Sequence, residues 1–187
     1  MKIEDNFLKQ EDFDKLHEFM FGSIDSRFYW VFVSRYYQAS HPKFAIEAAS
    51  IDLKGTELDQ YAFIHTFYNN HVPMSPYMEH LDCILQKIRP VSIIKIKANL
   101  LTRLPYKNES PLHSDLTELS EEQQKQWTTS IFYVNTNDGY TVFEDGTKVE
   151  SVANRMLTFP ANLKHTGTTC TDQQIRIVIN FNYYKNG

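Results

Sequence analysis

The fold is decided by residues 129–184, which read TSIFYVNTNDGYTVFEDGTKVESVANRMLTFPANLKHTGTTCTDQQIRIVINFNYY. In this stretch, short runs of β-branched and aromatic residues alternate with turn signals, of which Asn137-Asp-Gly139 and Glu144-Asp-Gly146 are the strongest. The runs predict strands at Thr129–Asn135, Tyr140–Glu144, Thr147–Val152, Met156–Phe159, Leu163–Thr168 and Gln174–Tyr184. Short strands at such even spacing are typical of a β-sandwich or a jelly roll.

Helices are predicted mainly before this stretch. Apolar residues at helical spacing predict a helix over Gln10–Phe21. A second helix is predicted from Ser75-Pro76, where a hydroxyl cap precedes a proline at the first helical position, and Pro90 ends it. A short third helix, capped by Ser120, is predicted inside the loop Thr117–Gln126, and this loop is a candidate active-site lid.

The remaining segments read as strands. Aromatic and β-branched residues predict strands at Phe28–Val33 and Tyr61–Tyr68. After Pro90 the pattern alternates, so one side of a further strand carries Ile94, Ile96, Ala98 and Leu100 and the other carries Lys95, Lys97 and Asn99. The sequence therefore predicts a mainly β protein with flanking α-helices, in which the helices pack outside a β core.

Length and composition limit the domain organisation. The chain has 187 residues, of which 42% are hydrophobic and 14% aromatic, which suits a folded, β-rich protein. It shows no internal repeat and no flexible linker. We expect one domain, 1–187, in which residues 1–90 form an N-terminal extension packed on a core formed by residues 91–187.

Charge and cysteine content favour a cytoplasmic protein. The net charge is −4 and no dense cluster of Lys and Arg is present, so nucleic acid is a disfavoured partner. Cys83 and Cys170 form no CxxC pair, which favours a reducing compartment. The polar, acidic start is unlike a signal peptide, and no apolar run of about 18 residues predicts a membrane span.

Two segments of the β half carry side chains that bind metals. His113-Ser-Asp115 places an imidazole and a carboxylate two residues apart, so in an extended chain both point to the same side. His165 lies fifty positions beyond Asp115, on a predicted strand that follows a turn. Two imidazoles and one carboxylate form the facial triad that suits Fe(II) and leaves coordination positions open. The two segments meet only if the β half folds as a double-stranded β-helix.

A basic residue completes the pattern. Arg176 follows His165 by eleven positions, within the β-branched run Ile175–Phe181. A guanidinium that points into a β core needs an anionic partner. Each feature taken alone is more often a structural residue. The ordered set of HxD, about fifty residues of hairpins, a second histidine and an arginine on the last long strand is far more specific.

The region Ile93–Tyr184 resembles the Fe(II)/2-oxoglutarate-dependent dioxygenase superfamily, and within it the prolyl 4-hydroxylase-like branch. Residues 129–135 are similar to the strand after HxD, on which a tyrosine often bonds the co-substrate, and Tyr133 occupies that place. Residues 138–143 are similar to a hairpin of the family that carries a glutamate at the position of Tyr140. Asn180 corresponds to a position that often carries a hydroxyl in contact with the co-substrate.

The resemblance implies a function. Iron would be held by His113, Asp115 and His165, and 2-oxoglutarate would bind with its distal carboxylate on Arg176. O2 would be the second co-substrate, succinate and CO2 the products, and ascorbate a candidate reductant. Because Asp115 is present, where related halogenases carry a small residue, hydroxylation is the favoured reaction. The substrate would be a prolyl or other peptide side chain, or a small molecule.

Two other functions stay open at the level of sequence. An oxidative nucleic-acid demethylase of the AlkB type is one, and the acidic net charge counts against it. A non-catalytic jelly-roll module that binds a metal or ligand is the other. The complete set of ligands together with Arg176 counts against that reading.

Overall fold

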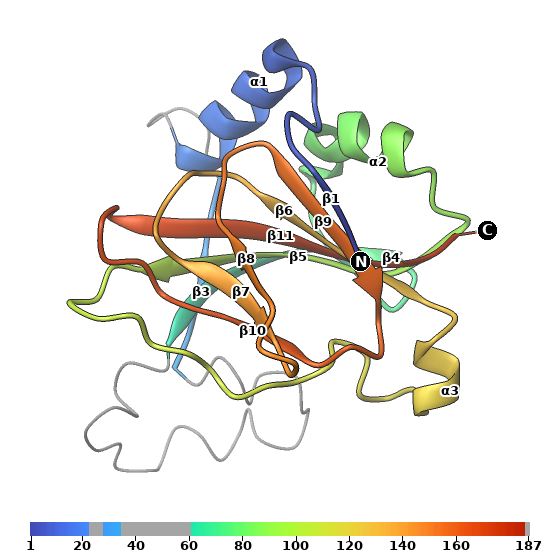
Figure 1. Ribbon diagram of the computed structural model, residues 1–187. Helices are drawn as coiled ribbons and strands as arrows, with labels where there is room; N and C mark the ends of the chain where they lie inside the picture. The colour runs from blue at the N-terminus through green and yellow to red at the C-terminus, as the bar shows by residue number, and fades with distance from the viewer. Residues whose placement is uncertain (23–27, 35–60, 186–187) are drawn as a thin grey trace.

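The computed structural model describes residues 1–22, 28–34 and 61–185 (Figure 1). In these residues the elements follow one another as β1 (Lys2–Glu4), α1 (Gln10–Phe21), β2 (Val31–Val33), β3 (Ala62–Asn69), β4 (Val72–Pro73), the 3-10 helix η4 (Met78–Leu81), α2 (Asp82–Ile88), β5 (Ser92–Thr102), α3 (Glu121–Gln124), β6 (Thr128–Tyr133), β7 (Tyr140–Phe143), β8 (Lys148–Glu150), β9 (Arg155–Pro160), β10 (His165–Gly167) and β11 (Ile175–Tyr184).

Two antiparallel sheets form the framework. The large sheet has the strand order β1-β9-β6-β11-β5-β3-β2, with β4 paired to β3, and the small sheet has the order β10-β7-β8. Figure 1 shows the small sheet in front of the centre of the large one. Buried side chains from both sheets pack in one cluster, made of Ile131, Tyr133, Phe143, Val149, Leu157, Phe159 and Val178. This arrangement is a double-stranded β-helix, which confirms the predicted fold class.

Helices α1 and α2 cover the other face of the large sheet, above it in Figure 1. The rings of Phe7 and Phe13 pack edge-on against Phe132 of β6, with centroids 6.2 and 6.3 Å away. Side chains of α1, α2 and the odd-numbered positions of β11 belong to the same buried cluster. Each fully buried side chain of this size contributes roughly 1.5–3 kcal/mol. Helices α1 and α2 thus cover one face of the large sheet, and the opposite face, which packs against the small sheet, is the one that can hold a functional site.

Most predicted elements are confirmed. The helix Gln10–Phe21 is observed with these bounds, and the six C-terminal strands are found within two residues of the predicted ends. The capped turn before α3 is also present, because the Ser120 hydroxyl accepts from Gln123 N and the Gln123 side chain accepts from Ser120 N. Within the described residues, no helix combines the length and apolarity needed to cross a bilayer.

Three local predictions are wrong. The strand predicted from Phe28 begins at Val31. The second helix begins as 3-10 structure at Met78, because the Ser75 hydroxyl is bonded to His65 Nε2 at 2.8 Å and accepts from Tyr77 N instead of capping a helix.

Ile94 does not share the face of Ile96. It packs with Leu116 and Ala161 in a separate cluster, beside a register irregularity between β5 and β11. Such an irregularity shifts the alternation of side chains by one position, which the sequence pattern does not reveal.

Candidate metal centre

The two segments that carry the predicted ligands pair through their backbones. His113 N donates to the His165 carbonyl at 3.0 Å, and His165 N donates to the His113 carbonyl at 2.9 Å. His165 lies on a strand, as predicted, and is the first residue of β10. The HxD motif, predicted at a strand end, lies in the loop beyond β5, and bridges from Glu109 to Thr168 and from His113 to His165 hold that loop. Directly opposed residues of an antiparallel pair point to the same side, so the two imidazoles meet.

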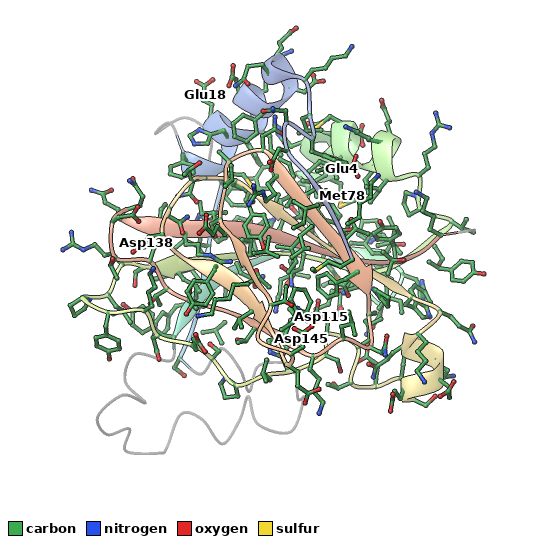
Figure 2. The ribbon with its side chains drawn as sticks, viewed as in Figure 1. Glu4, Glu18, Met78, Asp115, Asp138 and Asp145 are labelled. Carbon is green, nitrogen blue, oxygen red and sulfur yellow. The ribbon has the colours of Figure 1, made fainter. Side chains whose placement is uncertain are left out.

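The predicted ligands form one compact group. Asp115 Oδ1 lies 3.7 Å from His113 Nε2 and 4.0 Å from His165 Nε2. One ligand atom from each residue lies within 4.8 Å of the others. The side chain of His165 is 3% exposed and that of His113 31%, so the group is open on the His113 side. Asp115, labelled in Figure 2, lies toward the end of the sheets away from α1 and α2.

Both imidazoles are oriented in the same way. His113 Nδ1 lies 3.1 Å from the Pro111 carbonyl oxygen, and His165 Nδ1 lies 3.1 Å from the Leu163 carbonyl oxygen. A carbonyl oxygen only accepts, so Nδ1 carries the proton in each ring. The Nε2 lone pair then points at Asp115 and is available to a metal, an orientation typical of histidine ligands. The two rings therefore fit a divalent metal of the kind that the facial triad binds.

Amides on β11 hold the carboxylate. Asp115 Oδ2 accepts from Asn182 Nδ2 at 3.0 Å and from Asn180 Nδ2 at 3.4 Å, which leaves Oδ1 for the imidazole side. Burial on its own raises the pKa of the Asp115 carboxyl. The imidazoles of His165 and His113 and the Asn182 amide outweigh burial, so the net direction of the pKa is downward. The carboxylate is thus ionised, as a ligand must be.

Burial favours the neutral form of the second imidazole. Burial lowers the pKa of His165 below its ordinary value, although the Asp115 carboxylate acts in the opposite direction. A metal ligand has to be deprotonated at Nε2, so a lowered pKa favours binding at neutral pH.

Arg176 lies in a closely fitting polar niche. Its side chain is 2% exposed, Nε donates to the Ser151 hydroxyl at 2.8 Å and Nη2 donates to Thr141 Oγ1 at 3.4 Å. A Cβ atom on Gly167 would lie 3.0 Å from Nη1, and one on Gly139 would lie 2.7 Å from Cδ. The two glycines therefore make room for the guanidinium. A guanidinium presents a fork of N–H donors that matches the two oxygens of a carboxylate, so the niche suits a carboxylate.

Tyr133 lies beside this niche. Its hydroxyl donates to Thr141 Oγ1 at 2.8 Å, and its ring centroid lies 5.8 Å from the guanidinium carbon of Arg176. Burial raises the pKa of Tyr133, so the phenol stays protonated. Thr141 accepts from both Tyr133 and Arg176, so its own hydroxyl proton is left to donate elsewhere. The predicted contact of Tyr133 with a co-substrate stays a prediction.

One narrow cavity joins the metal ligands to the arginine. It is lined by Asn99, Leu101, His113, Ile131, Thr141, His165, Gly167, Arg176, Val178 and Asn180. Asn180, predicted near the co-substrate, lines this cavity and also bonds Asp115. A larger cleft of about 680 Å³ lies next to HxD and includes Ser114, Leu163 and Lys164.

Sequence reasoning missed three functional candidates. These are Asn182 on Asp115, Thr141 beside Arg176, and Asn99 in the cavity wall. The sequence carries a signal for Asn182, since alternate residues of a strand face one side and Asn182 falls on the same side as Arg176 and Asn180. Asn99 falls on the polar side of its predicted strand, but the sequence indicates no role for it.

Comparison with known proteins supports the fold. No protein-family model and no curated protein matches the sequence. A prolyl hydroxylase from Trichoplax adhaerens, solved with a peptide fragment of the hypoxia inducible factor oxygen degradation domain, aligns over 98% of this chain and 82% of its own, with TM-score 0.59 and 13% identity. A 2OG-Fe(II) oxygenase family oxidoreductase from Burkholderia pseudomallei covers 84% of this chain and 86% of its own, with TM-score 0.50 and 12% identity. The chain therefore has the fold found in 2-oxoglutarate oxygenases.

Proposed function

We propose that this protein is an Fe(II)- and 2-oxoglutarate-dependent dioxygenase. The observation that carries the proposal is a single cavity lined by a buried Arg176 and by His113 and His165, which form one group with Asp115. A facial triad leaves coordination positions open, and a buried guanidinium matches a carboxylate. 2-Oxoglutarate meets both demands, since it carries an α-keto acid at one end and a carboxylate at the other.

The residues present fit both groups. His113 and His165 would bind iron through Nε2 and Asp115 through Oδ1, because the other ligand atoms already bond the backbone or Asn182. Arg176 would bind the distal carboxylate of 2-oxoglutarate. When bound, the iron and 2-oxoglutarate supply oxygen activation, with release of succinate and CO2 and transfer of one oxygen atom to the substrate.

The protein orients the two imidazoles and lines the cavity with apolar side chains. The carbonyl bonds fix the two imidazoles before any metal binds, so little reorganisation is needed. Leu101, Ile131 and Val178 line the cavity with apolar surface and exclude bulk water around the carboxylate contacts. Because Asp115 supplies a carboxylate to the triad, we propose hydroxylation as the reaction.

The substrate that we propose is a prolyl or other peptide side chain, or a small molecule, as in the prolyl 4-hydroxylase-like branch. The structural neighbour from Trichoplax adhaerens is a prolyl hydroxylase in complex with a peptide. The cleft of about 680 Å³ beside Ser114 gives a molecule of that size a place next to the metal ligands.

The test needs no substrate. The protein is prepared without oxygen, loaded with Fe(II) and titrated with 2-oxoglutarate, and the metal-to-ligand absorbance in the visible range is recorded. Admission of oxygen should then give slow succinate formation. His113→Ala or His165→Ala should abolish both signals. Arg176→Ala should weaken 2-oxoglutarate binding by at least about 30-fold, since loss of one partner of a buried charge pair costs about 2 kcal/mol or more.

Two matched variants serve as controls. His17→Ala changes a histidine on α1, and Arg155→Ala removes an arginine that pairs with Asp5 at 2.6 Å. Both should leave the absorbance and the 2-oxoglutarate affinity unchanged. An Arg176→Ala protein that binds 2-oxoglutarate as tightly as the wild type would refute the co-substrate assignment.

A further inference from the structure

Asn99 lies on β5 in the wall of the cavity and carries a buried acceptor atom. Its side chain is 3% exposed, and among the described residues Asn99 Oδ1 has no hydrogen-bond partner. A buried polar atom without a partner costs about 1–3 kcal/mol, and such atoms are rare in folded proteins. A ligand that enters the cavity can therefore gain by completing this hydrogen bond.

A chain of amides fixes which atom of Asn99 is left as an acceptor without a partner among the described residues. Asp115 can only accept, so Asn180 donates through Nδ2, at 3.4 Å from Asp115 Oδ2. Asn180 Oδ1 is then an acceptor, and Asn99 donates to it through Nδ2 at 3.4 Å. The remaining atom of Asn99 is Oδ1, which can only accept. Asp115 thus fixes which atom of each amide donates and which accepts, and the series of hydrogen bonds ends in the acceptor Asn99 Oδ1.

The register of β5 against β11 places this acceptor midway along the cavity. Asn99 is paired with Val178, which lies between Arg176 and Asn180 on the same side of β11. Arg176 marks the carboxylate end and Asn180 contacts Asp115 at the metal end. Asn99 therefore faces the middle of a molecule that spans the two ends.

We propose that Asn99 is a specificity-determining residue, whose Oδ1 accepts a hydrogen bond from a molecule that carries an N–H or O–H group between its two acidic ends and forms no such bond with 2-oxoglutarate. This inference rests on the proposed function, which defines the two ends of that molecule. 2-Oxoglutarate carries only methylene groups between its keto carbon and its distal carboxylate. N-Oxalylglycine has the same two acidic ends and an N–H in place of one methylene, so the cavity distinguishes the two.

The experiment compares these two ligands. The protein is loaded with Mn(II) in place of iron, so that the ligands are not consumed during the measurement. The dissociation constants of 2-oxoglutarate and N-oxalylglycine are then measured by isothermal titration calorimetry. The wild type should prefer N-oxalylglycine. In Asn99→Leu, which has a similar size and no polar atom, that preference should fall by at least about 5-fold, as expected for loss of one buried hydrogen bond.

Controls separate this reading from others. Val178→Ala reshapes the same part of the cavity without removing a polar atom, so both ligands should change in parallel and the preference should persist. Asn99→Ala removes the same acceptor without adding bulk, and it replaces Asn99→Leu if circular dichroism shows that the leucine variant does not fold.

Each other outcome overturns the inference. If Asn99→Leu and the wild type prefer N-oxalylglycine over 2-oxoglutarate to the same extent, Asn99 does not hydrogen-bond the ligand. An equal loss for both ligands would show that its amide donates rather than accepts. Failure of the wild type to bind either ligand would instead refute the proposed function, and the inference with it.

Discussion

Asn182 is expected to set the metal affinity of the site, although it is not a ligand. It is 1% exposed, and its Nδ2 lies 3.0 Å from Asp115 Oδ2 and 3.0 Å from Thr129 Oγ1. The amide therefore holds the outer oxygen of the carboxylate and leaves Oδ1 toward the imidazoles. Asn182→Leu keeps the volume of the side chain and removes both hydrogen bonds.

The size of the effect follows from these contacts. A hydrogen bond to a charged group contributes about 1.5–3 kcal/mol, which is about 10- to 150-fold in an equilibrium constant. Asn180, at 3.4 Å from the same oxygen, retains a weaker bond, so part of the effect is preserved. Loss of groups that orient metal ligands typically lowers affinity 10- to 100-fold. We expect the dissociation constant for Mn(II) to rise about 10- to 50-fold.

The assay is Mn(II) titration followed by electron paramagnetic resonance, since free and bound Mn(II) differ in signal. Thr129→Val is the matched control, because it removes the other partner of the Asn182 amide and leaves the bond to Asp115 in place. It should change the affinity by less than about 3-fold, which corresponds to part of one neutral hydrogen bond. An Asn182→Leu protein that melts cooperatively and binds Mn(II) within 2-fold of the wild type would refute the reasoning.

Two further predictions concern the arginine niche and a buried histidine. Gly167→Ala would place a Cβ atom 3.0 Å from Arg176 Nη1, so the guanidinium must shift. The affinity for 2-oxoglutarate, measured by calorimetry, should weaken several-fold, while Mn(II) binding is retained. An unchanged affinity for 2-oxoglutarate would contradict the close fit. Burial lowers the pKa of His65 below its ordinary 6.5. Below that pH the unfolded chain therefore binds a proton at His65 more readily than the folded chain does. The melting temperature should drop as the pH falls through about 6.5. That slope should be shallower in His65→Gln, and an identical slope would show that His65 does not contribute.

The β half could be predicted from the sequence because its signals are local. Glu144-Asp-Gly146 and similar turns divide the chain, and the runs between them are rich in β-branched and aromatic residues. Local signals fail where tertiary contacts compete. The Ser75 hydroxyl is a suitable helix cap by sequence, but it bonds His65 of β3 in the folded chain, and the helix starts later.

The candidate site shows the same division. His113, Asp115, His165 and Arg176 could be singled out because their residue types are unusual for a β core and their order along the chain is informative. Asn99 could not, because an asparagine on a strand carries no signal of its partner. Its role depends on which strands are neighbours, and the pairing of β5 with β11 is a long-range fact.

A single strand determines both ends of the cavity. Arg176 and Asn180 are four residues apart on the same side of β11, and a strand rises about 3.3 Å per residue, so their Cα atoms lie about 13 Å apart. Arg176 marks one end of this span, and Asn180 contacts Asp115 at the other. We propose that the regular spacing of this buried strand sets the length of the molecule that the cavity accepts.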